Sequence, residues 1–333
     1  MKLLIRPAPE VAIKSKPVRR QQMRHLRQNI RKLLARLDPE IRVDGSWDRV
    51  DVEVPDGRGL SGPVLEALLR IPGISTIQEI GAFPFVSLDD VANKAVEAFA
   101  DRLKGKTFAV RARRHGEHNF RSIDLERTVG GALMQASEAR GVDLKSPQVE
   151  VRIEVHDDQF HIAHRKHRGL GGYPLGSVEN VLTLISGGYD SSVAAYLMMR
   201  RGLRNHFLFF NLGGAAHEVG VRQVVHYLWD RYGASHSAKF ISVPFEGVVA
   251  EIMRSVSHRH WGVVLKRQML MAAAEIAKKN NASGVVTGDA VAQVSSQTLS
   301  NLNVVDRASD EVVLRPLVSM DKESIIRIAR EIG

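Results

Sequence analysis

The feature that most constrains this chain is a short apolar stretch, residues 181–185, that runs directly into two glycines. Five apolar or β-branched residues in a row indicate a buried strand, and the apolar helical pattern from Val193 to Met199 indicates a helix. Gly187 and Gly188 lack a Cβ atom, so the backbone can turn sharply there and approach a ligand closely. Amide groups at a helix start, together with the helix dipole, attract anions. The stretch therefore predicts an anion-binding turn.

The residues of the turn exclude two common phosphate-binding loops. A Walker A loop requires a lysine that is absent here, and the spacing of dinucleotide-binding glycines is absent too. The remaining pattern, Ser-Gly-Gly-Tyr-Asp-Ser, resembles the pyrophosphate loop (PP-loop) of ATP pyrophosphatases, which cleave ATP between its α and β phosphates. The resemblance implies that the pyrophosphate end of ATP is held by Ser186, Gly187, Gly188, Asp190 and Ser191. It also implies a Mg²⁺ ion near Asp190 that offsets phosphate charge. The alternative is an ordinary strand-to-helix turn with a Ser or Asp cap.

From residue 181 onward the sequence alternates between short apolar segments and helical patterns. The predicted strands are 181–185, 206–210, 239–243, 284–287 and 312–314, and the predicted helices are 191–201, 218–232, 246–256, 263–279 and 321–332. Strands separated by helices indicate an α/β fold with a doubly wound parallel sheet, whose ligands bind beyond the carboxyl ends of the strands. The candidate residues at that edge are the loop 186–191, the segment from Asn211 to Gly214, and Gly288 with Asp289.

Upstream of this region the pattern predicts two smaller α+β units. The first, of ferredoxin-like type, combines a strand at 2–6, a long helix at about 18–37, a hairpin of 41–46 and 49–54, a short helix at 61–70 and a strand at 75–80. The second combines helices at 88–103 and 122–140 with a strand at 107–113 and a hairpin of 149–155 and 160–164. A glycine-rich basic segment, 164–176, then indicates a linker.

The positive charge of the chain is concentrated at its start. The formal net charge is +10, and residues 1–37 alone carry eleven Lys or Arg residues against one acid, Glu10. A local basic excess predicts a surface that binds a polyanion, although a solvated helix face is the alternative. The candidate nucleic-acid contacts on the long helix are Arg20, Arg24, Arg27 and Arg31. A second basic group comprises Lys104, Lys106, Arg111, Arg113, Arg114 and His115.

Two segments around that second group resemble a THUMP domain, an RNA-binding module: Phe108–Gly116 and Glu126–Gly131. With Phe210–Glu218, Val264–Arg267 and Gln293–Thr298, the resemblance extends to the family of tRNA 4-thiouridine synthetases (tRNA sulfurtransferases) and covers essentially the whole chain. It implies a ferredoxin-like domain at 1–60, a THUMP domain at 61–165, a linker at 166–176 and a PP-loop ATP pyrophosphatase domain at 177–333.

The chemistry that the resemblance implies is ATP-dependent transfer of sulfur to tRNA. The O4 atom of uridine 8 attacks the α-phosphate of ATP, pyrophosphate leaves into the loop, and a persulfide delivers sulfur to C4 to give 4-thiouridine. Asp190 and Lys266 are the predicted catalytic residues, because a lysine can stabilise charge that develops on phosphate. The remaining predicted ATP contacts are Leu184, Ile185, Asn211, Gly288 and Gln297. His217 is interpreted as a structural or RNA-facing residue rather than a base.

The implied partners are tRNA, a persulfide donor such as a cysteine desulfurase, and a second copy of the chain. A role in thiamine thiazole synthesis is implied by the resemblance alone. Two alternatives stay open: a PP-loop synthetase that activates a small molecule, and an RNA-binding protein without turnover.

Cysteine is absent from the sequence, which excludes disulfides, thiolate metal sites and a cysteine nucleophile within these 333 residues. Many members of the resembled family carry a catalytic cysteine beyond the segment that matches Leu314–Leu317. We therefore expect a chain truncated at its C-terminus that adenylates its substrate but does not thiolate it alone. The sequence has no apolar run of about 18 residues and no signal peptide, so we expect a cytosolic protein.

Overall fold

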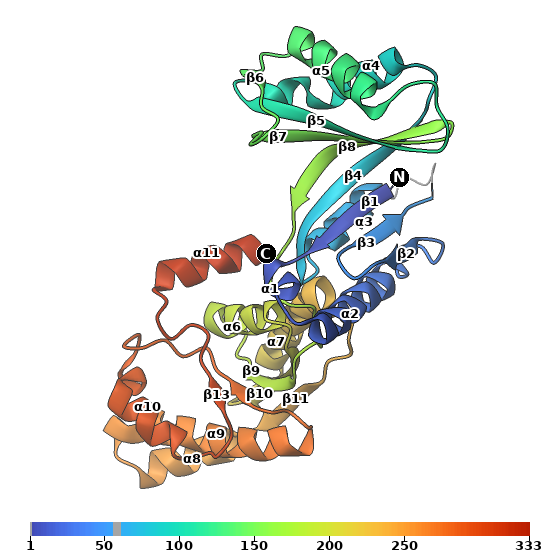
Figure 1. Cartoon of the computed structure of the whole chain (residues 1–333). Coiled ribbons are helices and arrows are strands. Elements are labelled where there is room, and N and C mark those ends of the chain that lie inside the picture. Colours follow the sequence, from blue (N-terminus) through green and yellow to red (C-terminus); the bar gives the residue numbers. More distant parts are fainter. Residues whose placement is uncertain (1, 56–60) are drawn as a thin grey trace. The chain divides into compact units, whose positions relative to one another are not determined.

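The structure is a computed structural model that describes residues 2–55 and 61–333 (Figure 1). The chain divides into two compact units, each assembled from separate segments. Unit 1 contains residues 1–6, 34–69 and 75–169, and unit 2 contains residues 7–33, 70–74 and 170–333. The predicted end of the ferredoxin-like domain, at residue 60, lies outside the described residues, and the domain boundaries stay a prediction.

Unit 1 is built on one mixed sheet. Its described strands follow the order β2-β3-β1-β4-β8-β7-β5-β6. The strands are β1 (Lys2–Pro7), β2 (Arg42–Gly45), β3 (Val50–Glu53), β4 (Ile74–Pro84), β5 (Thr107–His115), β6 (Gly141–Val142), β7 (Val149–His156) and β8 (Gln159–Arg168). The helices are α3 (Ser61–Leu69), α4 (Leu88–Leu103) and α5 (Ser122–Ala136). The antiparallel pairing of β4 with β8, from Thr76 opposite Arg168 to Pro84 opposite Gln159, makes the sheet continuous.

The second half of unit 1 buries its core on one face of the sheet. Helices α4 and α5 cover β5, β7 and β8, as Figure 1 shows, and their apolar side chains meet in one cluster. Phe99, Phe108 and Phe160 are almost fully buried within it. Helix α4 begins where predicted, because the hydroxyl group of Ser87 caps it by accepting a hydrogen bond from the amide of Asp90.

Several predicted ends of strands and helices differ from the structure. Strand β8 runs to Arg168, past the predicted end of that strand at residue 164, a difference that arises because its pairing with β4 is not marked by the polar residues 165–168. Helix α5 ends at Ala136 rather than 140, because Ser137 adopts an extended backbone and its hydroxyl group donates to the Leu133 carbonyl. The long basic helix is α2 (Lys16–Leu34), which ends three residues before the predicted residue 37.

Unit 2 contains a parallel sheet with the order β11-β10-β9-β12-β13. Its strands are β9 (Asn180–Leu184), β10 (Arg204–Asn211), β11 (Phe240–Pro244), β12 (Val285–Val286) and β13 (Val313–Leu314). Its helices are α1 (Pro9–Ala12), α2, α6 (Tyr189–Arg200), α7 (Ala215–Leu228), α8 (Glu246–Ser255), α9 (Trp261–Lys279), α10 (Leu299–Asp306) and α11 (Lys322–Ile332). The chain winds outward from β9 to β11 and then returns to β12, so the winding direction reverses between β9 and β12. The α/β fold with a doubly wound sheet is thus confirmed, and α1 and α10 are helices that the prediction missed.

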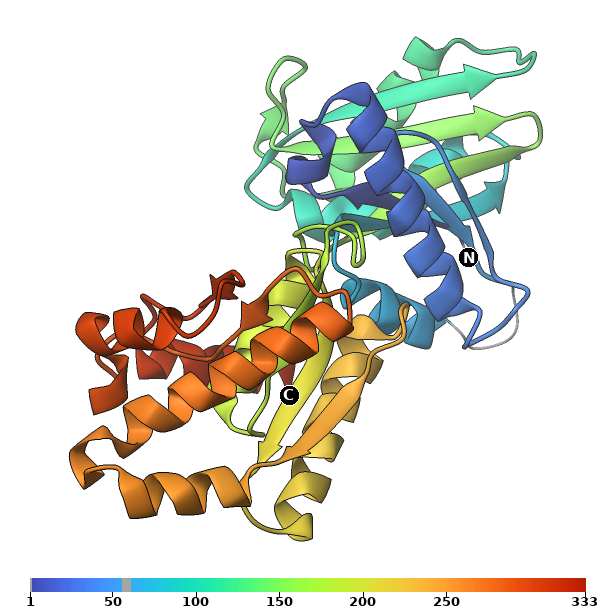
Figure 2. The same ribbon diagram turned by 90° about the horizontal axis from the view of Figure 1, so that it is seen from below.

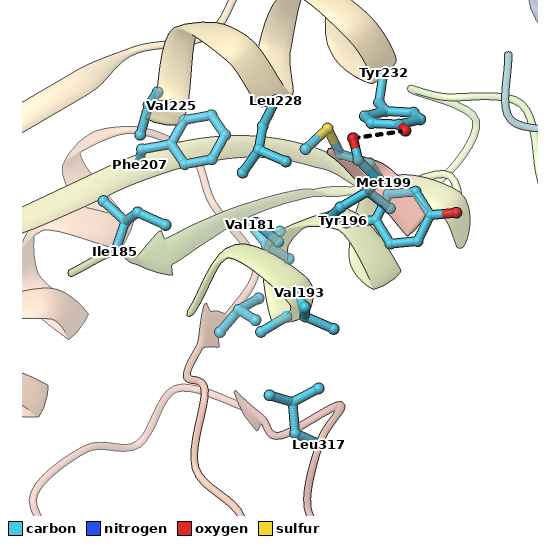
Figure 3. Packing of buried hydrophobic residues seen from close by; sticks show 14 of the residues in the cluster. Val181, Ile185, Val193, Tyr196, Met199, Phe207, Val225, Leu228, Tyr232 and Leu317 are labelled. Atoms are coloured by element: carbon cyan, nitrogen blue, oxygen red, sulfur yellow. Dashed lines mark hydrogen bonds between the residues drawn. The ribbon is translucent and has the colours of Figure 1, made fainter. Parts of the chain in front are cut away.

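Both faces of this sheet are covered. One cluster joins α6, α7 and α11 to the first face, where Phe207, Val225 and Leu228 pack together (Figure 3). The hydroxyl group of Tyr232 donates to the carbonyl of Ile332 at the edge of this cluster. A second cluster joins α9, which Figure 2 shows in orange, to the other face.

Helix α2 belongs to unit 2 for most of its length. Its apolar face is buried, since Met23, Leu26 and Ile30 are almost fully buried. The amide group of the buried Asn29 donates to the Leu175 carbonyl at 2.9 Å, which ties the helix to the segment before β9. In the described residues, none of the helices has the length and apolar character that crossing a membrane requires.

Candidate functional site

The turn after β9 has the geometry that its glycines predict. Gly187 adopts φ of 81°, a left-handed conformation that favours glycine, and a Cβ atom there would lie 3.1 Å from Cγ2 of Val221. The Ser186 amide donates to the hydroxyl oxygen of Ser191 at 3.2 Å, which closes the turn across the start of α6. The N-cap residue, Gly188, supplies no side-chain cap, so the first amides of α6 are left for a ligand.

Asp190 stands in the first turn of α6 with partners from distant parts of the chain. The ammonium group of Lys322, at the start of α11, lies 2.7 and 2.9 Å from the two carboxylate oxygens. The amide of Gln293 donates to the same carboxylate at 3.1 Å. The sequence analysis did not predict Lys322 as a site residue, because nothing in the sequence around it indicates a contact with Asp190. Gln293 was visible only as the first residue of a segment that resembles the family.

A cavity of about 320 Å³ opens beside this turn, at the carboxyl ends of β9 and β12 where the winding reverses. Its apolar lining comes from β9, β10, α9 and α10: Leu184, Ile185, Leu208, Phe209, Phe210, Leu212, Met269, Leu270 and Val305. Its polar lining comprises Ser186, Asp190, Ser191, His217, Lys266, Thr287, Asp289 and Arg315, together with the backbone of Gly288. An apolar chamber with one polar end suits a purine that carries a charged chain.

At the polar end, the buried Asp289 carboxylate is surrounded by donors. Its Oδ1 atom accepts from Lys266 Nζ at 2.7 Å and from Gln297 Nε2 at 3.0 Å. Its Oδ2 atom accepts from the hydroxyl group of Thr287 at 2.8 Å and lies 3.5 Å from Arg315 Nε. Burial opposes ionisation of Asp289, but the charge and hydrogen bond of Lys266, with those of Gln297 and Thr287, outweigh it and hold its pKa below the usual range.

Gly288 brings two of these segments into contact. A Cβ atom at this position would lie 2.9 Å from the backbone of Asp190 and Ser191, so only a residue without a side chain lets the loop after β12 meet the start of α6.

The Nε2 atom of His217 lies 3.2 Å from the Ser186 carbonyl oxygen, which places His217 at the cavity wall. Asn211 and Gln297 are not part of the lining: Asn211 donates to Glu218 at 3.1 Å, and Gln297 donates to Asp289.

The predicted nucleic-acid contacts fall in both units. Arg20, Arg24 and Arg31 are exposed on α2 and Arg27 is half-buried, all within unit 2. The second basic group lies in unit 1, where Lys106 and Arg113 are exposed. Several of its members have local partners: Lys104 pairs with Glu138, Arg111 with Glu150, Arg114 with two backbone carbonyls, and the His115 ring stacks on His156. Arg111 and Arg113 line a hollow of about 640 Å³ in unit 1.

Three protein-family models match the chain. The model described as Thiamine biosynthesis protein (ThiI) matches residues 176–333, the THUMP domain model matches 85–165, and the ThiI ferredoxin-like domain model matches 2–77. Among curated relatives, the tRNA sulfurtransferase of Marinobacter nauticus is 83% identical over 333 residues. That of Pseudomonas aeruginosa UCBPP-PA14 is 51% identical over 335 residues. Both alignments cover all of this chain and 69% of the relative.

A solved structure shares the fold over the whole chain. The crystal structure of a 4-thiouridine synthetase–RNA complex with bound ATP superposes with a TM-score of 0.81 at 24% sequence identity, covering 100% of this chain and 85% of that one. At this identity the likeness supports the fold alone.

Proposed function

The chain belongs to the tRNA sulfurtransferase family, and we propose that it uses ATP to activate a tRNA uridine so that sulfur can replace the O4 atom of the base. The observation that carries the proposal is the cavity at the point where the winding reverses. One wall is the uncapped start of α6 with Asp190, and the other carries Lys266 beside Asp289. The adenine base fits the apolar lining, and the phosphates fit the amides of the turn.

The first step is attack of the uridine O4 on the α-phosphate of ATP. The new O4–P bond forms as the bond to the β-phosphate breaks, and pyrophosphate leaves toward the turn at Ser186–Ser191. The base loses its N3 proton to solvent and becomes an adenylated intermediate with a good leaving group at C4. Lys266 lies on the cavity wall where it stabilises charge that develops on the transferred phosphate. The terminal sulfur of a persulfide then attacks C4 and AMP leaves, so the base is joined to the donor through an S–S bond. A second thiol of the donor attacks the inner sulfur, breaks that bond and releases 4-thiouridine, and the donor is left oxidised as a disulfide.

Magnesium fits the site through the nucleotide. In the part of the chain that the structure describes, no group of three or more His, Cys, Asp or Glu side chains could hold a metal ion. Mg²⁺ is commonly bound by one or two carboxylates together with substrate phosphates, and Asp190 offers such a carboxylate at the turn. The ion would supply charge neutralisation for the departing pyrophosphate.

The partners follow from the same proposal. A tRNA presents the uridine, and the basic residues of α2 and of the Lys104–His115 group contact its phosphates. Because the chain has no cysteine, we propose that the persulfide comes from a donor protein such as a cysteine desulfurase. We further propose that the protein acts as a homodimer in the cytoplasm, and that sulfur transfer for the thiamine thiazole is a second use of the same site.

The test is incubation of the protein with α-labelled ATP, Mg²⁺ and an unmodified tRNA transcript. We expect AMP and pyrophosphate that depend on the tRNA and are lost when uridine 8 is changed. Asp190→Ala should abolish AMP formation while tRNA affinity stays close to that of the wild type, and Asp310→Ala, an exposed acid of the same unit, should behave as the wild type. Formation of ADP, or of AMP without any dependence on tRNA, would refute the proposal and favour a small-molecule synthetase. Tight tRNA binding without turnover would favour an RNA-binding protein.

A further inference from the structure

In the described residues, Asp289 has more side-chain partners beside the cavity than any predicted ATP contact has. Only 9% of the residue is exposed, and a buried carboxylate is stable only where cations and donors surround it. Its four partners come from four places in the chain: α9 (Lys266), the end of β12 (Thr287), the short 3₁₀ turn before α10 (Gln297) and the residue after β13 (Arg315). Two of these partners, Lys266 and Gln297, are predicted ATP contacts.

The two cations at Asp289 depend on it differently. Arg315 has a second acidic partner, Asp306, whose carboxylate oxygens lie 3.1 and 2.5 Å from its guanidinium nitrogens. In the described residues, Asp289 is the one acidic partner of Lys266. Removal of the Asp289 charge would therefore leave Arg315 with a counter-charge and Lys266 without one.

The geometry also shows what the carboxylate does to each ATP contact. A lysine ammonium group on a four-carbon stem has three donors and many rotamers. Asp289 takes one of these donors, which holds the group at the cavity wall with the other two still able to meet a phosphate. A carboxylate only accepts hydrogen bonds, so the nitrogen of the Gln297 amide must face Asp289 and the oxygen must face away.

We propose that Asp289 is a positioning residue of the nucleotide site, which acts on ATP through Lys266 by fixing its ammonium group, and which holds the amide of Gln297 in one orientation beside it. The inference rests on the proposed function, because it takes Lys266 as an ATP contact. It predicts that loss of the carboxylate weakens ATP binding as much as loss of the lysine does.

The experiment measures ATP affinity by calorimetry, and kcat and KM for tRNA-dependent AMP formation, in the full chain. Asp289→Asn keeps the shape of the side chain but removes the charge. We expect it to raise Kd and KM for ATP by about 10- to 100-fold, the range of a lost charge-assisted hydrogen bond, with a smaller effect on kcat. Lys266→Met should cause a loss of similar size. The double variant should bind ATP at most about threefold more weakly than the weaker-binding of the two single variants, because the two residues act as one unit.

Two further variants separate positioning from folding. Asp306→Asn, which removes only the second partner of Arg315, should change ATP affinity by less than about threefold. Asp289→Glu keeps the charge but extends the side chain by one methylene, which displaces the carboxylate. This displacement should still weaken ATP binding. The variant therefore tests the same inference if Asp289→Asn does not fold.

Three results would overturn the inference: ATP affinity close to that of the wild type in a folded Asp289→Asn, the same in Asp289→Glu, or losses that multiply in the double variant. A wild-type protein that binds ATP but forms no AMP would instead refute the proposed function, and the calorimetric comparison would still test the role of Asp289.

Discussion

Replacement of Gly288 by alanine tests whether the loop after β12 must touch the start of α6. The added Cβ atom would lie 2.9 Å from the Asp190 carbonyl carbon and from the Ser191 amide nitrogen. Ordinary contact between such atoms is about 3.5 Å or more, so the two segments must separate by at least roughly 0.6 Å. Overpacking of this kind costs about 1–3 kcal/mol. The same shift moves the α6 amides away from Lys266, and a displacement of about 1 Å at a reacting site can cost roughly 100-fold in rate.

The assay compares kcat/KM for tRNA-dependent AMP formation with the free energy of unfolding in urea. We expect Gly288→Ala to lose about 10- to 100-fold in kcat/KM together with about 1–3 kcal/mol of stability. Gly220→Ala is the matched control, because nothing lies within 4 Å of its Cβ position and it stands inside α7. That change should stabilise the protein by about 0.5–1 kcal/mol and leave the rate unaltered. If Gly288→Ala equalled the wild type in both rate and stability, the proposed contact between the two segments would be refuted.

Two other substitutions test the packing of unit 2. Burial lowers the pKa of His236 from 6.5 to about 4, and the charges of Lys32 and Arg204 act in the same direction. The unfolded state therefore binds more protons in this window, and stability should fall as the pH drops from 6.5 to 4 by about 2 kcal/mol, a value discounted for the partial exposure of the ring. His236→Gln should flatten that fall in urea unfolding at pH 7 and pH 4.5, and an unchanged pH dependence would contradict the assignment. Thr298→Ala removes the hydroxyl cap that accepts from the Asn301 amide at the start of α10. It should cost about 1 kcal/mol in the same measurement, and Thr298→Ser should restore most of it.

The parts of the fold that the sequence predicted are those with strong local signals. Helix α4 was placed at its observed bounds, since its apolar spacing and its serine cap lie within the segment itself. Helix α10 was missed because Leu299–Asp306 is short and its apolar residues form only a weak stripe. The end of β8 was missed for a different reason: the extended conformation of His167 and Arg168 is set by pairing with β4, about ninety residues away, and not by their own pattern.

The same division applies to the candidate site. The turn at Ser186–Ser191 could be predicted because glycine, serine and a helix start are close in sequence. Its counter-charges could not, because Lys322 reaches Asp190 from 132 residues away, and Arg315 reaches Asp289 from the far side of α10. Such pairs are fixed by the order of the strands, which brings the carboxyl ends of β9, β12 and β13 to one edge.

These ion pairs predict that the binding of ATP and the binding of tRNA depend differently on salt concentration. In the described structure, each cation at the cavity is already paired: Lys266 with Asp289, Lys322 with Asp190, and Arg315 with Asp289 and Asp306. ATP phosphates therefore meet cations whose charge carboxylates already balance, and partly buried charges are screened little by salt. The exposed arginines of α2 would instead release counterions from tRNA. Between about 50 and 200 mM salt, we expect tRNA affinity to fall steeply while ATP affinity changes by less than about threefold. Parallel slopes for the two ligands would show that phosphate meets freely solvated cations at both sites.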